Sequence, residues 1–94
     1  MHESGIAERI VALALEHARE AGATRITDLH LEIGDDAGAT EEAVAFHLEE
    51  AARGTMVEGA EIHFLAATDE RALRLVWVDV ECPEDDLDRA PAPA

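Results

Sequence analysis

The spacing of hydrophobic and polar residues changes along the chain and predicts where helices and strands lie. In residues 5–21 the apolar side chains recur at intervals of three or four, which predicts an amphipathic helix. Gly22 is expected to end it. The face expected to be buried carries Ile6, Ile10, Leu13, Ala14 and Ala21.

Residues 26–33, ITDLHLEI, alternate between two sets of positions, which is typical of a half-buried strand. The expected inward set is Thr27, Leu29, Leu31 and Ile33, and the expected outward set is Asp28, His30 and Glu32. The GDDAG that follows has the composition of a turn.

A second helix is expected after Thr40, because a threonine hydroxyl at this position can cap the free N–H groups of a first helical turn. The helix is expected to end near Arg53. Its inward stripe is predicted to be Val44, Leu48 and Ala51, with Phe46 at the edge.

Two further strands are predicted in the second half of the chain. Residues 60–66, AEIHFLA, place Ile62 and Phe64 inward, and residues 71–81, RALRLVWVDVE, form the last strand. The ATDE between them is short enough for a hairpin. The TMVE segment between Gly54 and Gly59 is expected to add a short extended piece before the first of these strands.

The last strand has apolar residues on both of its alternating faces. Val76, Val78 and Val80 oppose Leu73, Leu75 and Trp77. Either one set forms an exposed apolar patch, which would favour partner docking or a homodimer, or a β-bulge changes the register and keeps most of both sets covered.

The order helix, strand, helix, strand, strand defines the expected fold class. Two amphipathic helices on one face of a small sheet, of about three strands, bury every apolar stripe, so we predict a two-layer α+β fold. Residues 1–81 are expected to form one domain. Residues 82–94 are acidic and then rich in proline and alanine, and are expected to be a disordered tail.

The net charge of -15 narrows the classes of partner. It argues against nucleic acid and anionic membranes, because their phosphates need clustered basic side chains; a cation or a basic protein is the complement. No signal peptide or membrane span is evident. The single cysteine, Cys82, excludes an internal disulfide and a zinc site built on several thiolates, and fits a cytoplasmic protein.

The chain starts with Met-His-Glu, which offers a set of metal ligands close together. The α-amine of Met1, the amide nitrogen between Met1 and His2, and the His2 imidazole can close two fused chelate rings around one ion. The amide nitrogen or the carboxylate of Glu3 can complete a plane, although Glu3 can also simply favour the following helix. Deprotonated amides suit Ni(II) or Cu(II), which accept square-planar nitrogen ligands.

Several motifs together resemble the HypA/HybF nickel metallochaperones of hydrogenase maturation. They are MHE at the start, LHLEIGDDAG, TEEAVAFHLEEAARGTMVEGAEIHF, and RALRLVWVDVE as a closing strand. The resemblance covers roughly residues 1–65. It implies a non-enzymatic protein that binds Ni(II) through Met1, His2 and Glu3. It also implies delivery to hydrogenase large-subunit precursors with a HypB-type GTPase.

The chain departs from that family between its last two strands. The family inserts a zinc ribbon with two Cys-x-x-Cys pairs there, where this chain has ATDE. We therefore expect no zinc site, and we expect the nickel-binding part to fold without that module. The alternative is a metal-free scaffold or regulatory protein that keeps the fold and mediates contacts in metalloenzyme assembly.

The sequence leaves the roles of three other side chains undecided, those of His30, His63 and Cys82. His30 and His63 lie on the outward sides of their predicted strands, so they form a secondary nickel or zinc site if those strands are neighbours. The simpler interpretation is that both are solvated surface histidines. Cys82 is expected to be a lone thiol, since no nucleophilic site is evident around it.

Overall fold

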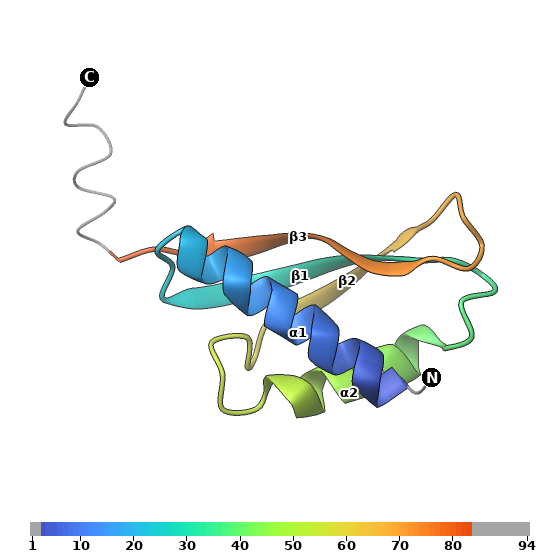
Figure 1. Cartoon of the computed structure of the whole chain (residues 1–94), viewed down its shortest axis with the longest axis horizontal. Helices are drawn as coiled ribbons and strands as arrows, with labels where there is room; N and C mark the ends of the chain where they lie inside the picture. The colour runs from blue at the N-terminus through green and yellow to red at the C-terminus, as the bar shows by residue number, and fades with distance from the viewer. Residues whose placement is uncertain (1–2, 84–94) are drawn as a thin grey trace, which may run out of the picture.

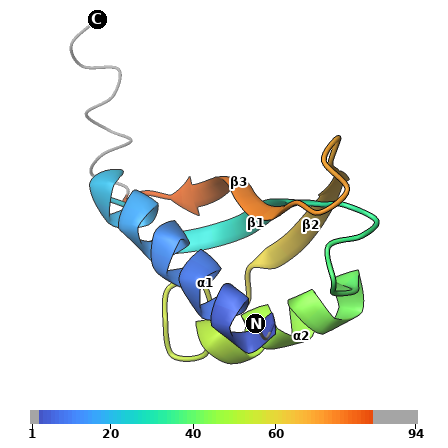
Figure 2. The same ribbon diagram turned by 45° about the vertical axis from the view of Figure 1, so that its right-hand side comes forward.

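The computed structural model describes residues 3–83 as two helices and three strands, in the predicted order (Figure 1). The elements are α1 (Glu3–Glu20), β1 (Arg25–Ile33), α2 (Glu41–Ala52), β2 (Glu61–Ala66) and β3 (Leu73–Glu81). Both helices lie on one side of the sheet and leave its other face open (Figures 1 and 2). The predicted α+β class with two layers is confirmed.

The hydrophobic core lies between the helices and the covered face of the sheet. Its largest fully buried side chains are Ile26, Leu29, Leu31, Leu48 and Val57. β1 supplies three of these residues because it is the central strand. Neither helix of the described part has the length and apolar character that crossing a bilayer requires.

The buried face of α1 is rotated from the predicted one and consists largely of small side chains. It holds Ala7, Ile10, Val11, Ala14 and Ala18. Leu13 is 41% exposed and Ala21 is exposed, so their predicted inward placement is wrong. α1 packs against both α2 and β3. Alanines suit this position because they let α1 approach its neighbours closely.

The start of α2 matches the prediction in detail. The Thr40 hydroxyl accepts a hydrogen bond from the Ala43 amide at 3.0 Å and caps the helix. The buried stripe is Val44, Leu48 and Ala52, whereas Ala51 is half-buried and Phe46 is 57% exposed.

The TMVE segment forms turns rather than the expected extended piece. These turns bury Val57, and the Met56 carbonyl accepts a hydrogen bond from the Ile26 amide at 3.0 Å.

β2 and β3 are not a hairpin, and in this respect the prediction is wrong. The strand order is β2-β1-β3, with β1 parallel to β2 and antiparallel to β3. Residues 67–72 pass across the end of β1, where the Gly34 amide donates to the Ala72 carbonyl at 2.9 Å. A short connection predicts a hairpin only when no other strand competes for the position between the two strands.

Two register shifts determine which side chains face the core. Thr27 is the extra residue in β1, so Ile26 is buried in place of the predicted Thr27. Val76 is the extra residue in β3, and the residues packed against the core on either side of it are Leu73, Leu75, Val78 and Val80. The bulge interpretation of β3 is therefore confirmed, and the exposed large apolar residues of this strand are Val76 and Trp77.

The predicted tail of residues 82–94 lies outside the described residues apart from its first two positions. The division of the chain at residue 81 therefore stays a prediction.

Candidate metal centre

The predicted nickel ligands come at the start of α1. Glu3 is the first residue of this helix, and Met1 and His2 lie outside the described residues. The four N–H groups of a first helical turn have no acceptor within the helix. The Glu3 amide is one of these groups, so using its nitrogen as a ligand removes no helical hydrogen bond.

The open face of the sheet brings together the two histidines of β1 and β2. His30 and His63 are directly opposite in the parallel pairing, and their rings stack with centroids 4.6 Å apart. On the other side of His30, Trp77 of β3 stacks at 4.0 Å. The three rings form a row across all three strands, which we call the aromatic row.

A row of three carboxylates lies beside the aromatic row. Asp28 of β1 is opposite Glu61 of β2 and opposite Asp79 of β3. Each carboxylate is two positions along its strand from a ring of the aromatic row, and period-two alternation puts the two rows on the same face. We call Glu61, Asp28 and Asp79 the carboxylate row.

Hydrogen bonds connect the two rows. His63 Nε2 lies 2.8 Å from Asp28 Oδ2, and His30 Nε2 lies 2.8 Å from Asp79 Oδ2. His63 Nε2 also lies 3.6 Å from Glu61 Oε1. Each imidazole therefore has its Nε2 directed at a carboxylate oxygen.

The pKa of Asp28 is held below its ordinary value by its hydrogen bonds. The largest cause is the Thr27 hydroxyl, which donates to Asp28 Oδ1 at 2.6 Å, and the hydrogen bond from His63 follows. Partial desolvation acts in the opposite direction. Asp28 is therefore a carboxylate, a hydrogen-bond acceptor or metal ligand, at neutral pH.

His30 and His63 were expected to meet only if their strands were neighbours, with two solvated surface histidines as the simpler interpretation, and the carboxylates beside them were not predicted. A pattern in the sequence could have indicated two of these carboxylates: an acidic residue stands two positions before the histidine in both strands, as Asp28-Leu-His30 and as Glu61-Ile-His63. Residues two apart share a face of a strand. The contribution of Asp79 was not visible in this way, because it depends on β3 pairing with β1.

His17, His47 and Cys82, the other histidines and the cysteine among the described residues, lie away from this cluster. His17 of α1 lies 3.8 Å from the Glu20 carboxylate, and His47 of α2 is next to the Phe46 ring. The Cys82 thiol, in a half-buried position, donates to the Ala21 carbonyl at 3.7 Å.

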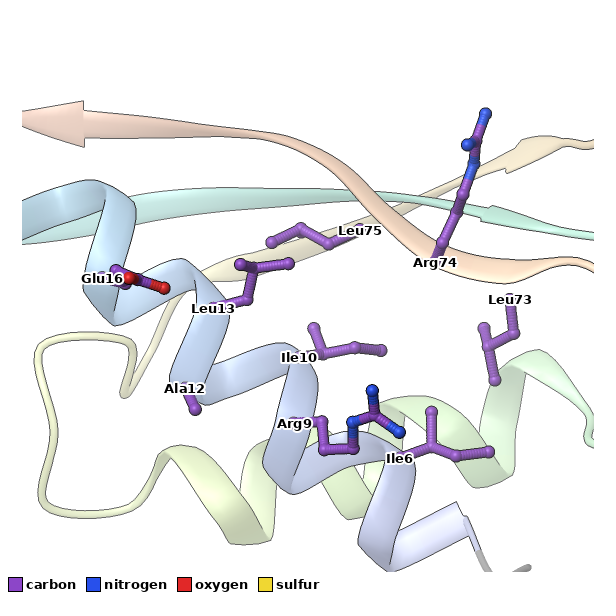
Figure 3. Close-up of a pocket in the computed structure, with 9 residues that line it drawn as sticks. All are labelled: Ile6, Arg9, Ile10, Ala12, Leu13, Glu16, Leu73, Arg74 and Leu75. Atoms are coloured by element: carbon purple, nitrogen blue, oxygen red, sulfur yellow. The ribbon is translucent and has the colours of Figure 1, made fainter.

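An apolar groove lies between α1 and β3 on the covered side of the sheet (Figure 3). Ile10 and Leu13 of α1 line one wall and Leu75 of β3 lines the other, while the Arg74 side chain points away from the groove. Arg74 instead donates to Glu32 at 2.8 Å. Glu16 is the one carboxylate among the residues that line the groove, so the lining offers mainly apolar contact and no cluster of metal ligands.

The chain matches a family model and several curated relatives. The model described as "Hydrogenase/urease nickel incorporation, metallochaperone, hypA" matches residues 1–73. The hydrogenase maturation factor HypA of Aeromonas hydrophila is 44% identical over 64 residues, which are 68% of this chain and 57% of the relative. The HypA of Chloroflexus aurantiacus is 47% identical over 62 residues, 66% of this chain and 54% of the relative.

The solved structures agree at the level of the fold. The solution structure of the nickel metallochaperone HypA from Helicobacter pylori superposes with a TM-score of 0.76 at 14% identity, covering 88% of this chain and 100% of that one. In sequence, the chain spans little more than half the length of the curated relatives it matches. With a family model that matches most of its length and a fold of the same topology, the chain belongs to the HypA family.

Proposed function

We propose that this protein binds Ni(II) through Met1, His2 and Glu3 and passes the ion on during [NiFe]-hydrogenase maturation. The observation that carries the proposal is the family match over residues 1–73, which includes the Met-His-Glu triplet. The proposal takes Met1 as the first residue of the protein, with a free α-amine.

The coordination chemistry supports nickel as the cargo. The α-amine, the backbone amide nitrogens and the His2 imidazole form a planar set of nitrogen ligands, which suits Ni(II) better than Zn(II), since zinc prefers a tetrahedral arrangement. The amine and the amides lose protons on binding, so the affinity falls as the pH falls. Release then occurs by ligand exchange to a partner that replaces these ligands one after another.

The proposed role is binding and transfer rather than catalysis. The recipient is a hydrogenase large-subunit precursor, and a HypB-type GTPase assists the transfer. Family membership supports the proposal of both partners. The strongly acidic surface favours a basic docking surface on the partner.

The connection between β2 and β3 supports a nickel-binding domain that needs no zinc ribbon. Ala66 and Leu73 lie at the same end of the sheet, separated by β1, a distance of about two strand spacings or ~10 Å. Residues 67–72 span it with hydrogen bonds to Gly34 and Asp36. We propose that this connection replaces the zinc module of the family.

Titration of the metal-free protein with Ni(II) tests the nickel site. We expect the absorption band of planar, diamagnetic Ni(II) in the wild-type protein. We expect at least about a tenfold loss of affinity in His2→Ala and in a version with extra residues before Met1. The His47→Ala variant is the control and should behave as the wild type.

The planar band belongs to amide-nitrogen ligands, so nickel bound elsewhere does not produce it. A wild-type protein without this band, or one whose band survives in both altered forms, would exclude the nickel carrier. The rival role, a metal-free scaffold in metalloenzyme assembly, then remains, and it predicts unchanged partner binding in His2→Ala.

A further inference from the structure

The open face of the sheet carries an unusual concentration of negative charge. The carboxylate row places Asp28 directly opposite both Glu61 and Asp79. Like charges at opposing cross-strand positions destabilise a sheet. The ion pairs that these three carboxylates make within the described residues are all with His30 or His63, and none is with an arginine. The row therefore lacks a permanent positive charge.

From this arrangement we infer that Asp28, His30 and His63 form a second metal site, for a divalent first-row transition ion. The site is separate from the Met-His-Glu terminus and does not depend on the nickel function proposed above. Asp79 and Glu61 are the carboxylates at its edges.

The distances suit one ion. One ligand atom from each of Asp28, His30 and His63 lies within 4.8 Å of the other two. Metal–nitrogen and metal–oxygen bonds of ~2.0–2.2 Å separate two tetrahedral ligand atoms by about 3.3–3.6 Å. Binding therefore closes the longest separation by up to about 1.5 Å, a movement shared between two side chains. The ion takes the place of the N–H hydrogen between His63 Nε2 and Asp28 Oδ2.

The surroundings hold the ligands in position before an ion arrives. The His30 side chain is 14% exposed, since its ring lies between those of His63 and Trp77. The Thr27 hydroxyl donates to the Asp28 oxygen that does not face His63. Such hydrogen bonds orient a ligating carboxylate.

The donor set indicates the class of ion. Two imidazoles and a carboxylate suit Zn(II), Ni(II) or Cu(II), whereas Mg(II) and Ca(II) prefer sites made of oxygen atoms alone. The absence of thiolates from the cluster makes it different in kind from a Cys-x-x-Cys site.

Trp77 provides a local probe of this site. It is the only tryptophan of the chain, which also has no tyrosine, and its ring stacks on His30 at 4.0 Å. A paramagnetic ion bound to His30 should quench its fluorescence. The described start of α1 lies on the other side of the sheet, so the two proposed sites give separate signals (Figure 2).

The test uses the full chain with His2→Ala, which removes the proposed terminal site. We expect one equivalent of Ni(II) to quench Trp77, and one equivalent of Zn(II) to bind in calorimetry and shift the NMR signals of the His30 and His63 rings. Adding His63→Asn should weaken binding at least about tenfold. Adding His47→Asn, on α2, should leave it unchanged.

Circular dichroism and thermal unfolding establish that each variant is folded. Should His63→Asn fail to fold, Asp28→Asn, which preserves the shape of the side chain, replaces it with the same expected loss. Failure of the His2→Ala protein to bind either ion would overturn the inference. So would equal losses in the His63 and His47 variants, because binding would then be unspecific.

Discussion

At the scale of single residues, His30 has the most distinctive environment of the open face. It lies in the middle of the central strand, so it has a cross-strand neighbour on each side, His63 and Trp77. Its Nε2 is directed at a carboxylate of a third residue, Asp79. Its ring is thus held by stacking on both faces and by one polar contact at the edge.

Asp28 gives a prediction about pH dependence in the metal-free protein. Its pKa is lower in the folded state than the ordinary value of 3.8. The resulting stabilisation is present above the unfolded pKa and is lost as the pH falls through the folded pKa. Thr27→Val removes the largest cause of the shift and should raise the pKa of Asp28.

NMR titration of the Asp28 carboxyl group measures this pKa, and urea unfolding measures the stability. The variant should be less stable than the wild type at neutral pH, and the difference should shrink in acid as Asp28 is protonated. An unchanged pKa of Asp28 in Thr27→Val would contradict the assigned cause.

At the scale of elements, the path from β2 to β3 is the decisive connection. Residues 67–72 cross the end of β1 instead of folding back in a hairpin. The crossing chain contacts Gly34 and donates and accepts hydrogen bonds there, including one from the Asp36 amide to the Glu70 carbonyl at 2.7 Å. β1 thereby gains partners along both edges and at its end.

Gly34 gives a prediction about this crossing. A Cβ atom at position 34 would collide with the backbone of Asp69 and Glu70. Gly34→Ala must push residues 67–72 away, and we expect a loss of about 1–3 kcal/mol in the free energy of unfolding, typical of overpacking. Urea denaturation measures it. Asp35→Ala, at the exposed neighbouring position, should change stability little, and equal effects of the two variants would count against the collision.

At the scale of the whole molecule, one side of the sheet is covered and the other is charged. The helices cover the apolar side (Figures 1 and 2), whereas the open side carries the aromatic row and the carboxylate row. The chain has a net charge of -15 spread over only 94 residues. Self-repulsion of this kind destabilises a compact state, and a domain of this size has little stability to spare.

Screening of this charge should stabilise the fold. We expect the Tm of the chelator-treated protein to rise between low and physiological ionic strength, since the Debye length falls to ~8 Å. Sodium and tetramethylammonium chloride should act alike at equal ionic strength, because screening does not depend on the identity of the cation. A Tm that is constant or falls with added salt would show that self-repulsion is unimportant here.

The elements of this protein were predictable from the sequence because their causes are local. The alternation of ITDLHLEI, the helical spacing before Gly22 and the capping hydroxyl of Thr40 each act over a few neighbouring residues. The Met-His-Glu triplet is likewise local, since its ligands come from consecutive residues. The face of α1 that is buried was predicted less well, because packing against other elements determines it. The exposure of Leu13, for example, depends on where α2 and β3 lie around α1.

The sequence by itself determined the order of the elements, the membership of the family and the composition of the proposed nickel site. Only the tertiary structure decided that β1 lies between β2 and β3, which residues bulge, and that Asp28 and Asp79 meet beside the two histidines. The physical reason is that strand pairing depends on contacts between residues far apart in the chain. A local pattern limits which face a side chain takes, but it does not choose the neighbour on that face.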